Sequence, residues 1–328
     1  MVKIAVDAMG GDHAPTVPVK ATLVSANEHQ DTEFILVGDE RTIQSHIDVM
    51  PSNVKILHAP DVIDQKAEPV KAVRRQKESS LVVCANMLKE QQVDGVISAG
   101  NTGAFMVSGL LIVGRIETID RPALAVILPS FKGGGVLLVD SGANTDCSAH
   151  HLEQFARMGS AYMQLTEGRV NPRIGLVNIG SEAQKGDELS KTAYTLLTST
   201  IEHFVGNVEG RELVHDVCDV AVCDGFVGNV LVKFYEGLGM GLEQSLRDMV
   251  KTTWRTKLAG YLLRSSFRQL FHRFDYAEYG GAPLLGVKGA MVKAHGSSNV
   301  RAYQVAIQQV YKMITSGVVH ALEESLQV

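Results

Sequence analysis

The chain has 328 residues, of which 45% are hydrophobic and 20% are charged, so it can bury a large core in one elaborate domain or two lobes. The formal net charge of −5 gives no reason to expect nucleic acid as a partner. Four cysteines without CxxC spacing predict reduced, packed thiols in a cytoplasmic protein. We expect no signal peptide and no membrane-spanning segment, because Met1 leads directly into a predicted strand and no apolar run is long enough.

Apolar, β-branched runs alternate with amphipathic stretches over the first two thirds of the chain. Strands are predicted at 2–6, 33–37, 54–57, 93–98, 124–128, 136–140, 173–178, 204–208 and 217–223. Helices are predicted at 17–28, 70–89, 149–165 and 188–199, and mainly helical segments at 229–274 and 298–326. The alternation predicts an α/β fold with three α/β/α layers around a doubly wound, mostly parallel sheet, followed by a helical C-terminal part.

Two further features describe the organisation. The glycine-rich loop 131–135 joins two neighbouring strands, which predicts a hairpin and therefore an antiparallel part of the sheet. No repeat, low-complexity tract or linker divides the chain. We therefore expect residues 1–328 to form a single catalytic domain with two lobes, which includes a basic amphipathic helical segment at 249–274.

The first predicted strand ends in a loop with two aspartates, a histidine and two glycines. Its sequence is Asp7-Ala8-Met9-Gly10-Gly11-Asp12-His13. Open α/β sheets bind ligands beyond the carboxyl ends of their strands, and paired glycines let the backbone approach a small ligand closely. The alternative is a tight strand-to-helix turn with solvated acids.

A second loop of small residues follows the strand at 93–98 and leads into a helix. It contains Gly100, Asn101, Thr102 and Gly103. A helix N-terminus offers unpaired N–H groups and the positive end of the helix dipole, so this loop is a candidate phosphate cradle. The alternative is an ordinary connection capped by Asn or Thr.

Three more small, polar loops have the same character. They are Asp140-Ser141-Gly142-Ala143-Asn144, Asp224-Gly225-Phe226-Val227-Gly228-Asn229-Val230 and His295-Gly296-Ser297-Ser298. Asn229 lies near the start of a helix and either caps it or holds a ligand, and either serine of the last loop is a plausible N-cap. We expect these loops and the Gly100–Gly103 loop to converge on a doubly charged phosphate.

Lys185 lies in the loop Asn178-Ile179-Gly180-Ser181-Glu182-Ala183-Gln184-Lys185-Gly186-Asp187-Glu188-Leu189. It is the cation that we place in the site, where it would neutralise phosphate or stabilise developing charge on a carbonyl oxygen. The alternative is a solvated surface charge.

Taken together and in this order, five of these motifs resemble the bacterial acyl-carrier-protein:phosphate acyltransferase family of phospholipid synthesis. They begin at Asp7, Ser98, Asp140, Asp224 and His295, and the resemblance covers nearly the whole chain. It implies transfer of a long-chain acyl group from acyl carrier protein to inorganic phosphate, which gives acyl phosphate. It also implies a fold similar to isopropylmalate dehydrogenases and phosphotransacetylases, a homodimer and peripheral membrane association. We expect no cofactor and no metal.

The resemblance gives the candidate residues their roles. The catalytic candidates are Lys185, Asn229 and His13; the phosphate-binding candidates are Gly100, Asn101, Thr102, Gly103 and Gly228; the supporting candidates are Asp12, Asp224, Asn144, His295 and Ser297. Phosphate oxygen would attack the thioester directly, without a covalent enzyme intermediate. His13 or His295 would protonate the departing thiolate, since imidazole can do so near neutral pH.

Two basic surfaces suggest partners. Arg74 and Arg75, with Lys71 and Lys77, form a basic helix face that would suit the small, acidic acyl carrier protein, although a solvated helix face is the alternative. The segment 249–274 contains six basic residues and no acid. Its apolar residues follow helical spacing and include Trp254, Leu258 and Leu262, so we expect it to lie on an anionic membrane; packing on protein is the alternative.

Two other functions remain as alternatives. One is a nicotinamide-dependent dehydrogenase on a similar fold; Gly237, Gly239 and Gly241 superficially resemble a dinucleotide fingerprint, but they lie inside a helical pattern. The other is a non-enzymatic, membrane-bound scaffold for acyl carrier protein. No P-loop motif is present, which disfavours a nucleoside triphosphate site.

Overall fold

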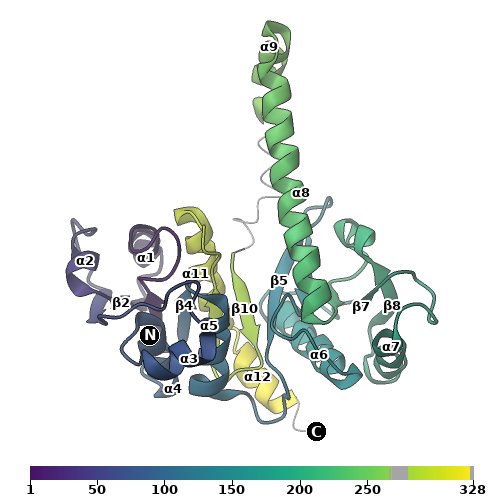
Figure 1. Ribbon diagram of the computed structural model, residues 1–328, viewed down its shortest axis with the longest axis horizontal. Coiled ribbons are helices and arrows are strands. Elements are labelled where there is room, and N and C mark those ends of the chain that lie inside the picture. The colour runs from purple at the N-terminus through teal and green to yellow at the C-terminus, as the bar shows by residue number, and fades with distance from the viewer. Residues whose placement is uncertain (266, 268–279, 326–328) are drawn as a thin grey trace.

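The computed structural model describes residues 1–265, 267 and 280–325. Its strands form one eleven-stranded sheet with helices on both faces, so the expected three-layer α/β fold is confirmed (Figure 1). The strands are β1 (Val2–Asp7), β2 (Thr32–Gly38), β3 (Val54–His58), β4 (Gly95–Ser98), β5 (Ala123–Pro129), β6 (Gly135–Val139), β7 (Ile174–Asn178), β8 (Phe204–Glu209), β9 (Val220–Val222), β10 (Ala282–Leu285) and β11 (Ala290–Lys293). The principal helices are α1 (Thr16–Glu28), α2 (Glu40–Gln44), α3 (Pro69–Arg75), α4 (Ser80–Lys89), α5 (Thr102–Ser108), α6 (Ala149–Leu165), α7 (Glu188–Thr200), α8 (Gly225–Lys251), α9 (Trp254–Leu262), α11 (Val300–Thr315) and α12 (Val318–Ser325).

The sheet has the order β3-β2-β1-β4-β11-β10-β5-β6-β9-β7-β8. Neighbouring strands are parallel except at β11–β10, β10–β5 and β5–β6, so the sheet is mostly parallel, as predicted. The predicted hairpin is the β5–β6 pair. Three antiparallel steps leave β6, β9, β7 and β8 running opposite to β1, β4 and β11.

Two strands in the middle of the sheet were not predicted. β10 and β11 are only four residues long, and the sequence pattern predicts no element at either of them. Pro283 pairs with Val292 inside this part of the sheet. Because proline lacks an N–H donor and normally indicates an edge strand or no strand, its presence hides a strand in the sequence pattern.

The helix predicted at 70–89 is two helices in the structure. α3 ends at Arg75, and α4 begins at Ser80 after an extended Ser79. The side-chain carboxylate of Glu68 accepts hydrogen bonds from the first N–H groups of α3, and Pro69 occupies the first helical position. The break places the hydroxyl group of Ser80 at a helix start that faces β1.

Hydrophobic residues form a core on each face of the sheet. On one face, Phe155 and Tyr162 of α6 and Tyr303 of α11 are fully buried. On the other face, residues of α3, α4 and α5, including the fully buried Phe105, form a second core. The candidate loops lie at the ends of the strands between these two layers.

α8 and α9 project from the rest of the molecule as a long arm (Figure 1). Only Gly225 and Gly228, both in the first turns of α8, are buried among its 27 residues. Within the segment predicted at 249–274, the structure describes the end of α8, the break at Thr252 and Thr253, and α9. Positions 266 and 268–274 of that segment lie outside the described residues.

No helix among the described residues combines the length and the apolar character that are needed to cross a membrane.

Candidate active site

Three neighbouring parallel strands present Asp7, Ser98 and Lys293 at the same level. Ser98 of β4 pairs in register with Lys293 of β11, and β1 pairs with β4 one residue earlier, at Val6 and Ile97. The hydroxyl groups of Ser98 and Ser80 each donate a 2.6 Å hydrogen bond to the Asp7 carboxylate. Burial raises the pKa of Asp7, although these hydrogen bonds act in the opposite direction. A buried polar row therefore lies beneath the predicted loops.

The loops that follow β1, β4 and β11 contact one another directly. The N–H of Asp12 donates to the carbonyl oxygen of Gly296 at 2.9 Å. A Cβ atom on Gly10 would lie 2.6 Å from the backbone nitrogen of Gly100, so only glycine allows this approach. The structure thus brings together three of the predicted loops, which we call the first loop group: 7–13, 98–103 and 295–298.

Both candidate histidines of the first loop group are exposed. The His13 side chain reaches solvent beside Asp12. Nδ1 of His295 lies 2.9 Å from the hydroxyl oxygen of Ser297. Neither serine of the last loop caps α11; the side chain of Asn299 does, by accepting from the N–H of Ala302. Ser297 is therefore left to orient the imidazole of His295.

Asn101 has a structural role that the sequence analysis presented only as the alternative. Its Oδ1 caps α5 by accepting from the N–H of Ala104 at 2.9 Å. Its Nδ2 donates to the carbonyl oxygens of Asp64, Gln65 and Ala67. An amide has two N–H donors, so in this conformation the side chain has none left for phosphate. The Asn101 side chain therefore holds the start of α5 in this structure, and a role for Asn101 in phosphate binding remains a prediction.

The remaining cradle residues differ in their surroundings. Thr102 is exposed at the first position of α5, whereas Gly100 is buried and donates its N–H to the hydroxyl oxygen of Ser98. A Cβ atom on Gly103 would lie 2.5 Å from Cγ of Pro69, so this glycine lets α5 pack against α3. Thr102 is therefore the exposed residue of this loop.

A second loop group, 140–144 and 224–229, forms at the carboxyl ends of β6 and β9. The buried Asp140 carboxylate accepts hydrogen bonds from four backbone N–H groups and from Nδ2 of Asn144. A Cβ atom on Gly228 would lie 1.9 Å from the carbonyl oxygen of Asp140, so α8 begins in direct contact with this loop. Asp224, rather than Asn229, caps α8 by accepting from the N–H of Val227. Asn229 is exposed and lies against Gly142.

The two loop groups are separate hydrogen-bonded units. The strands that carry them run in opposite directions, and no hydrogen bond among the described residues joins one group to the other. They nevertheless share a face of the sheet, because Ala143 packs against the hydrophobic core that contains Ala104 and Phe105 of α5. The sequence therefore predicted each loop but not this grouping, and convergence of the four small-residue loops on one phosphate remains a prediction.

Lys185 is exposed in the loop between β7 and α7. Its backbone N–H donates to the carbonyl oxygen of Glu182, and its carbonyl oxygen accepts from Nδ2 of Asn178. Gly186 has a φ of +92°, a conformation that favours glycine, and Asp187 caps α7 as expected of an acid at a helix start. The backbone of this loop is held while the Lys185 ammonium group stays in solvent.

The cysteines are poor nucleophiles in this fold. Burial raises the pKa of Cys147 to about 11 and that of Cys218 to about 12. Burial also raises the pKa of Cys84 and Cys223. Because the thiolate is the reactive form, none of these thiols is activated near neutral pH.

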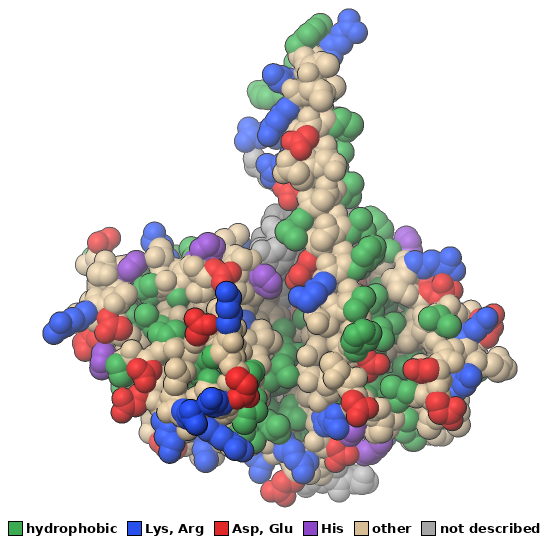
Figure 2. All heavy atoms as spheres, in the orientation of Figure 1, with side chains coloured by type: hydrophobic (Ala, Val, Ile, Leu, Met, Phe, Trp, Pro, Cys, Tyr) green, Lys and Arg blue, Asp and Glu red, His purple; other side chains and the backbone are tan. Residues whose placement is uncertain are grey.

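The predicted partner surfaces are exposed. Arg74 and Arg75 end α3, and Figure 2 shows Lys and Arg side chains gathered over this helix. Trp254 and Leu262 are each 71% exposed on α9. Figure 2 shows both hydrophobic and basic side chains exposed toward the tip of the arm.

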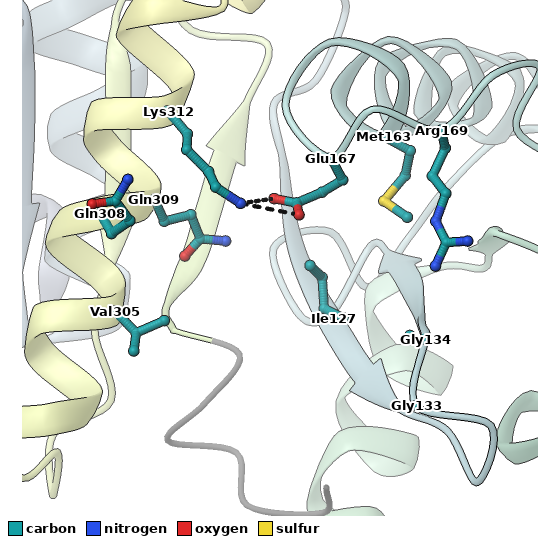
Figure 3. A pocket seen from close by; sticks show the side chains of 11 residues that line it. Ile127, Gly133, Gly134, Met163, Glu167, Arg169, Val305, Gln308, Gln309 and Lys312 are labelled. Atoms are coloured by element: carbon teal, nitrogen blue, oxygen red, sulfur yellow. Dashed lines mark hydrogen bonds and ion pairs between the residues drawn. The ribbon is translucent and has the colours of Figure 1, made fainter.

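A cavity of about 370 Å³ lies elsewhere, between α11 and the β5–β6 hairpin. Lys312 and Glu167 form an ion pair across it (Figure 3). None of the predicted site residues lines this cavity. Among the residues that the structure places, no group of three or more His, Cys, Asp and Glu side chains is arranged to hold a metal ion.

Lys293 is the residue that sequence reasoning missed. It is 7% exposed and occupies the end of β11, two residues before the His295 motif. The signal was a lysine that directly follows an apolar run and precedes a predicted ligand loop.

Comparison with known proteins gives consistent matches over nearly the whole chain. The sequence model of the family described as "Fatty acid synthesis protein" matches residues 2–321. The phosphate acyltransferase of Bacillus subtilis is 45% identical over 99% of this chain and 98% of its own length. The phosphate acyltransferase of Brevibacillus brevis is 46% identical over the same shares.

Solved structures resemble the fold at low sequence identity. A phosphotransacetylase from Streptococcus pyogenes superposes with a TM-score of 0.61 at 14% identity, covering 95% of this chain and 94% of that one. A 4-hydroxythreonine-4-phosphate dehydrogenase from Salmonella typhimurium gives a TM-score of 0.51 at 12% identity, covering 95% and 100%. At these identities the likeness concerns the fold alone.

Proposed function

The chain belongs to the fatty acid synthesis protein family and to its phosphate acyltransferases, and we propose that it transfers an acyl group from a thioester to inorganic phosphate. The observation that carries this function is the full-length match, at 45% identity, to a phosphate acyltransferase. The two glycine-rich loop groups support it, because in each group glycines let backbone segments of different loops approach closely. The enzyme is an acyltransferase, and the dehydrogenase alternative is not favoured.

The proposed donor is a long-chain acyl group on acyl carrier protein, and the product is acyl phosphate for phospholipid synthesis. The exposed basic surface on α3 supports a small acidic protein as the partner. Arg74 and Arg75 would steer the carrier toward the first loop group, because α5 packs directly on α3.

We propose that phosphate binds at the first loop group, near Gly100, Thr102 and Gly103. A phosphate oxygen attacks the thioester carbonyl carbon, the carbon–sulfur bond breaks, and the thiolate accepts a proton from His13. The acyl group is never attached to the protein, in keeping with four thiols whose pKa values are raised. Binding both substrates together makes the step effectively intramolecular, which contributes on the order of 7–11 kcal/mol.

The second loop group and the loop that carries Lys185, between β7 and α7, complete the proposed site. Asn229 and Lys185 would hold charge that develops on the carbonyl oxygen, while Asp224, Asn144 and Gly228 fix the start of α8. His295, Ser297 and Asp12 support the first loop group, and Asn101 anchors the start of α5. This arrangement requires the two groups to face each other across the thioester.

The arm supports two further proposals. The exposed apolar and basic residues of α9 suit reversible docking on anionic lipid, where a membrane-soluble acyl phosphate would leave the enzyme. The long, exposed α8 offers a surface for a homodimer. Both fit a cytoplasmic protein that associates peripherally with membrane.

The test is to incubate the protein with acyl carrier protein thioester and phosphate and to trap acyl phosphate with hydroxylamine. Formation of hydroxamate at a rate that depends on phosphate is expected. A non-enzymatic scaffold would bind the carrier and give no hydroxamate, and a dehydrogenase would change the absorbance of added NAD.

A further inference from the structure

We propose that the ammonium group of Lys293 is a ligand of the phosphate substrate, at the carboxyl end of β11. This inference rests on the proposed function, since it assigns a residue to the phosphate site of the same reaction. Lys185 would then stabilise negative charge on the thioester carbonyl oxygen, whereas Lys293 would bind the attacking phosphate.

The position of Lys293 in the sheet places its side chain beside the candidate phosphate cradle. It lies in register with Ser98 on the neighbouring strand, and the Ser98 hydroxyl group reaches Asp7 on the strand beyond. Met291, two residues earlier on β11, belongs to the core beneath α4 and α5. Because side chains two apart share a face of a strand, Lys293 points to the same face as α5, whose first residues form the candidate phosphate cradle.

The ammonium group of Lys293 has fewer acceptors than donors. An ammonium group has three N–H donors. In the part of the chain that the structure describes, its one acceptor is the carbonyl oxygen of Ala294, 2.5 Å away. Since the side chain is more than nine-tenths buried, the two remaining donors are held away from bulk water. Leaving buried N–H donors unpaired costs free energy, so we expect ligand oxygen atoms to accept the two remaining hydrogen bonds.

Lys293 also balances negative charge at this end of the sheet. The carboxylates that face Lys293 are Asp7, from β1, and Asp12, from the loop beyond it. Burial lowers the pKa of Lys293 to about 8, and these two carboxylates act against that shift. His13 and His295 lie on the exposed side of the same loops. Without Lys293, two aspartates would repel a phosphate dianion from this end of the sheet.

The hydrogen bond to Ala294 also links the residue to the predicted site. Ala294 leads directly into the loop whose Gly296 carbonyl oxygen accepts from Asp12. A phosphate held by Lys293 would therefore lie where the 7–13, 98–103 and 295–298 loops meet.

The experiment measures binding of inorganic phosphate to the full-length protein by calorimetry, for wild type, Lys293→Met and Lys293→Arg. Lys288→Met is the matched control, because Lys288 is an exposed lysine between β10 and β11 that pairs with Glu117. We expect Lys293→Met to weaken phosphate binding at least tenfold, Lys293→Arg to recover part of it, and the control to bind as wild type does. In turnover, the KM for phosphate should rise while the KM for the acyl thioester stays the same.

A folded Lys293→Met variant that binds phosphate as tightly as wild type would overturn the proposal. If this variant does not fold, the wild type still provides a test between pH 8 and 10, where phosphate remains a dianion. Its dissociation constant should rise at least tenfold as Lys293 loses its proton, and a constant value would overturn the proposal equally. If wild type binds phosphate through Lys293 but makes no acyl phosphate, the proposed function fails and this assignment stands.

Discussion

The hydroxyl group of Ser98 donates a 2.6 Å hydrogen bond to the carboxylate of Asp7, which lies 91 residues earlier in the chain. Both side chains are at most 2% exposed. The bond fixes the carboxyl ends of β1 and β4 at the same level, and the loops that follow then meet above it. Lys293 extends this row to a third strand, so a buried polar row supports the site.

The stability of the protein should depend on pH through Lys293. Burial lowers its folded-state pKa to about 8 from an ordinary value of 10.5. The unfolded chain therefore binds more protons between these values, and the contribution of Lys293 to stability rises as pH rises through that window. Each pKa unit corresponds to about 1.4 kcal/mol. Urea denaturation at pH 7.5 and 10 should show this rise relative to Lys293→Met, and parallel pH curves for the two proteins would contradict it.

Asn101→Ala should destabilise the protein as well as impair phosphate use. It removes the α5 cap and the bonds to the 64–67 loop, at a cost of about 2–4 kcal/mol. Asn101→Asp keeps an oxygen for the cap but loses the donors, so it should cost less than Asn101→Ala. Denaturant midpoints of the three proteins provide the measurement, and equal midpoints would show that the side chain does not anchor this loop.

Lys185→Ala should lower kcat on the order of 10²–10³-fold while the fold survives, because the side chain is exposed and its charge is needed only as the carbonyl oxygen becomes negative. Asn229→Ala should also lower kcat, because its amide is proposed to hold the same developing charge. Lys191→Ala, an exposed lysine on α7, is the control and should keep full turnover. Unchanged turnover of a folded Lys185→Ala variant would remove this residue from the site.

Reversing charge on α3 should weaken use of the carrier. The double variant Arg74→Glu, Arg75→Glu should raise the KM for acyl carrier protein, and the difference from wild type should shrink as salt screens the charges. Lys20→Glu, on the exposed face of α1, changes net charge in the same direction and provides the control. The double variant changes the net charge by −4 and Lys20→Glu changes it by −2, so an effect of Lys20→Glu in that proportion would indicate a net-charge effect rather than a docking surface.

Leu258→Glu should abolish co-sedimentation with anionic liposomes at low salt while acyl phosphate formation in detergent persists. Leu258 is 54% exposed on α9, where its burial in lipid would be lost. Val170→Glu changes a side chain that is 84% exposed outside the arm, and it should sediment as wild type does. Sedimentation of Leu258→Glu at the wild-type level would assign α9 to packing on protein instead.

Much of the fold was predictable because buried parallel strands are continuous apolar runs, as at 2–6 and 33–37. β10 was not, since Pro283 interrupts its pattern. The carboxyl-end loops were also predictable as loops. The grouping of those loops depends on strand direction, which the two unpredicted central strands determine.

The hydrogen bonds and the burial of side chains in the site could not be predicted from the sequence. The three acceptors of Asn101 Nδ2 lie 34 to 37 residues earlier in the chain. Lysine is almost never buried without a partner, so Lys293 at a strand end reads as a surface charge until its strand is placed. Both cases depend on contacts between segments that the linear pattern does not relate.

Direct acyl transfer to phosphate is tested most directly by a single turnover with excess enzyme over acyl carrier protein thioester, with and without phosphate. Free carrier thiol and hydroxylamine-trapped acyl phosphate are measured in the same samples. We predict that both appear only when phosphate is present, and in equal amounts. Release of carrier thiol without phosphate, or release with phosphate but without acyl phosphate, would contradict direct transfer.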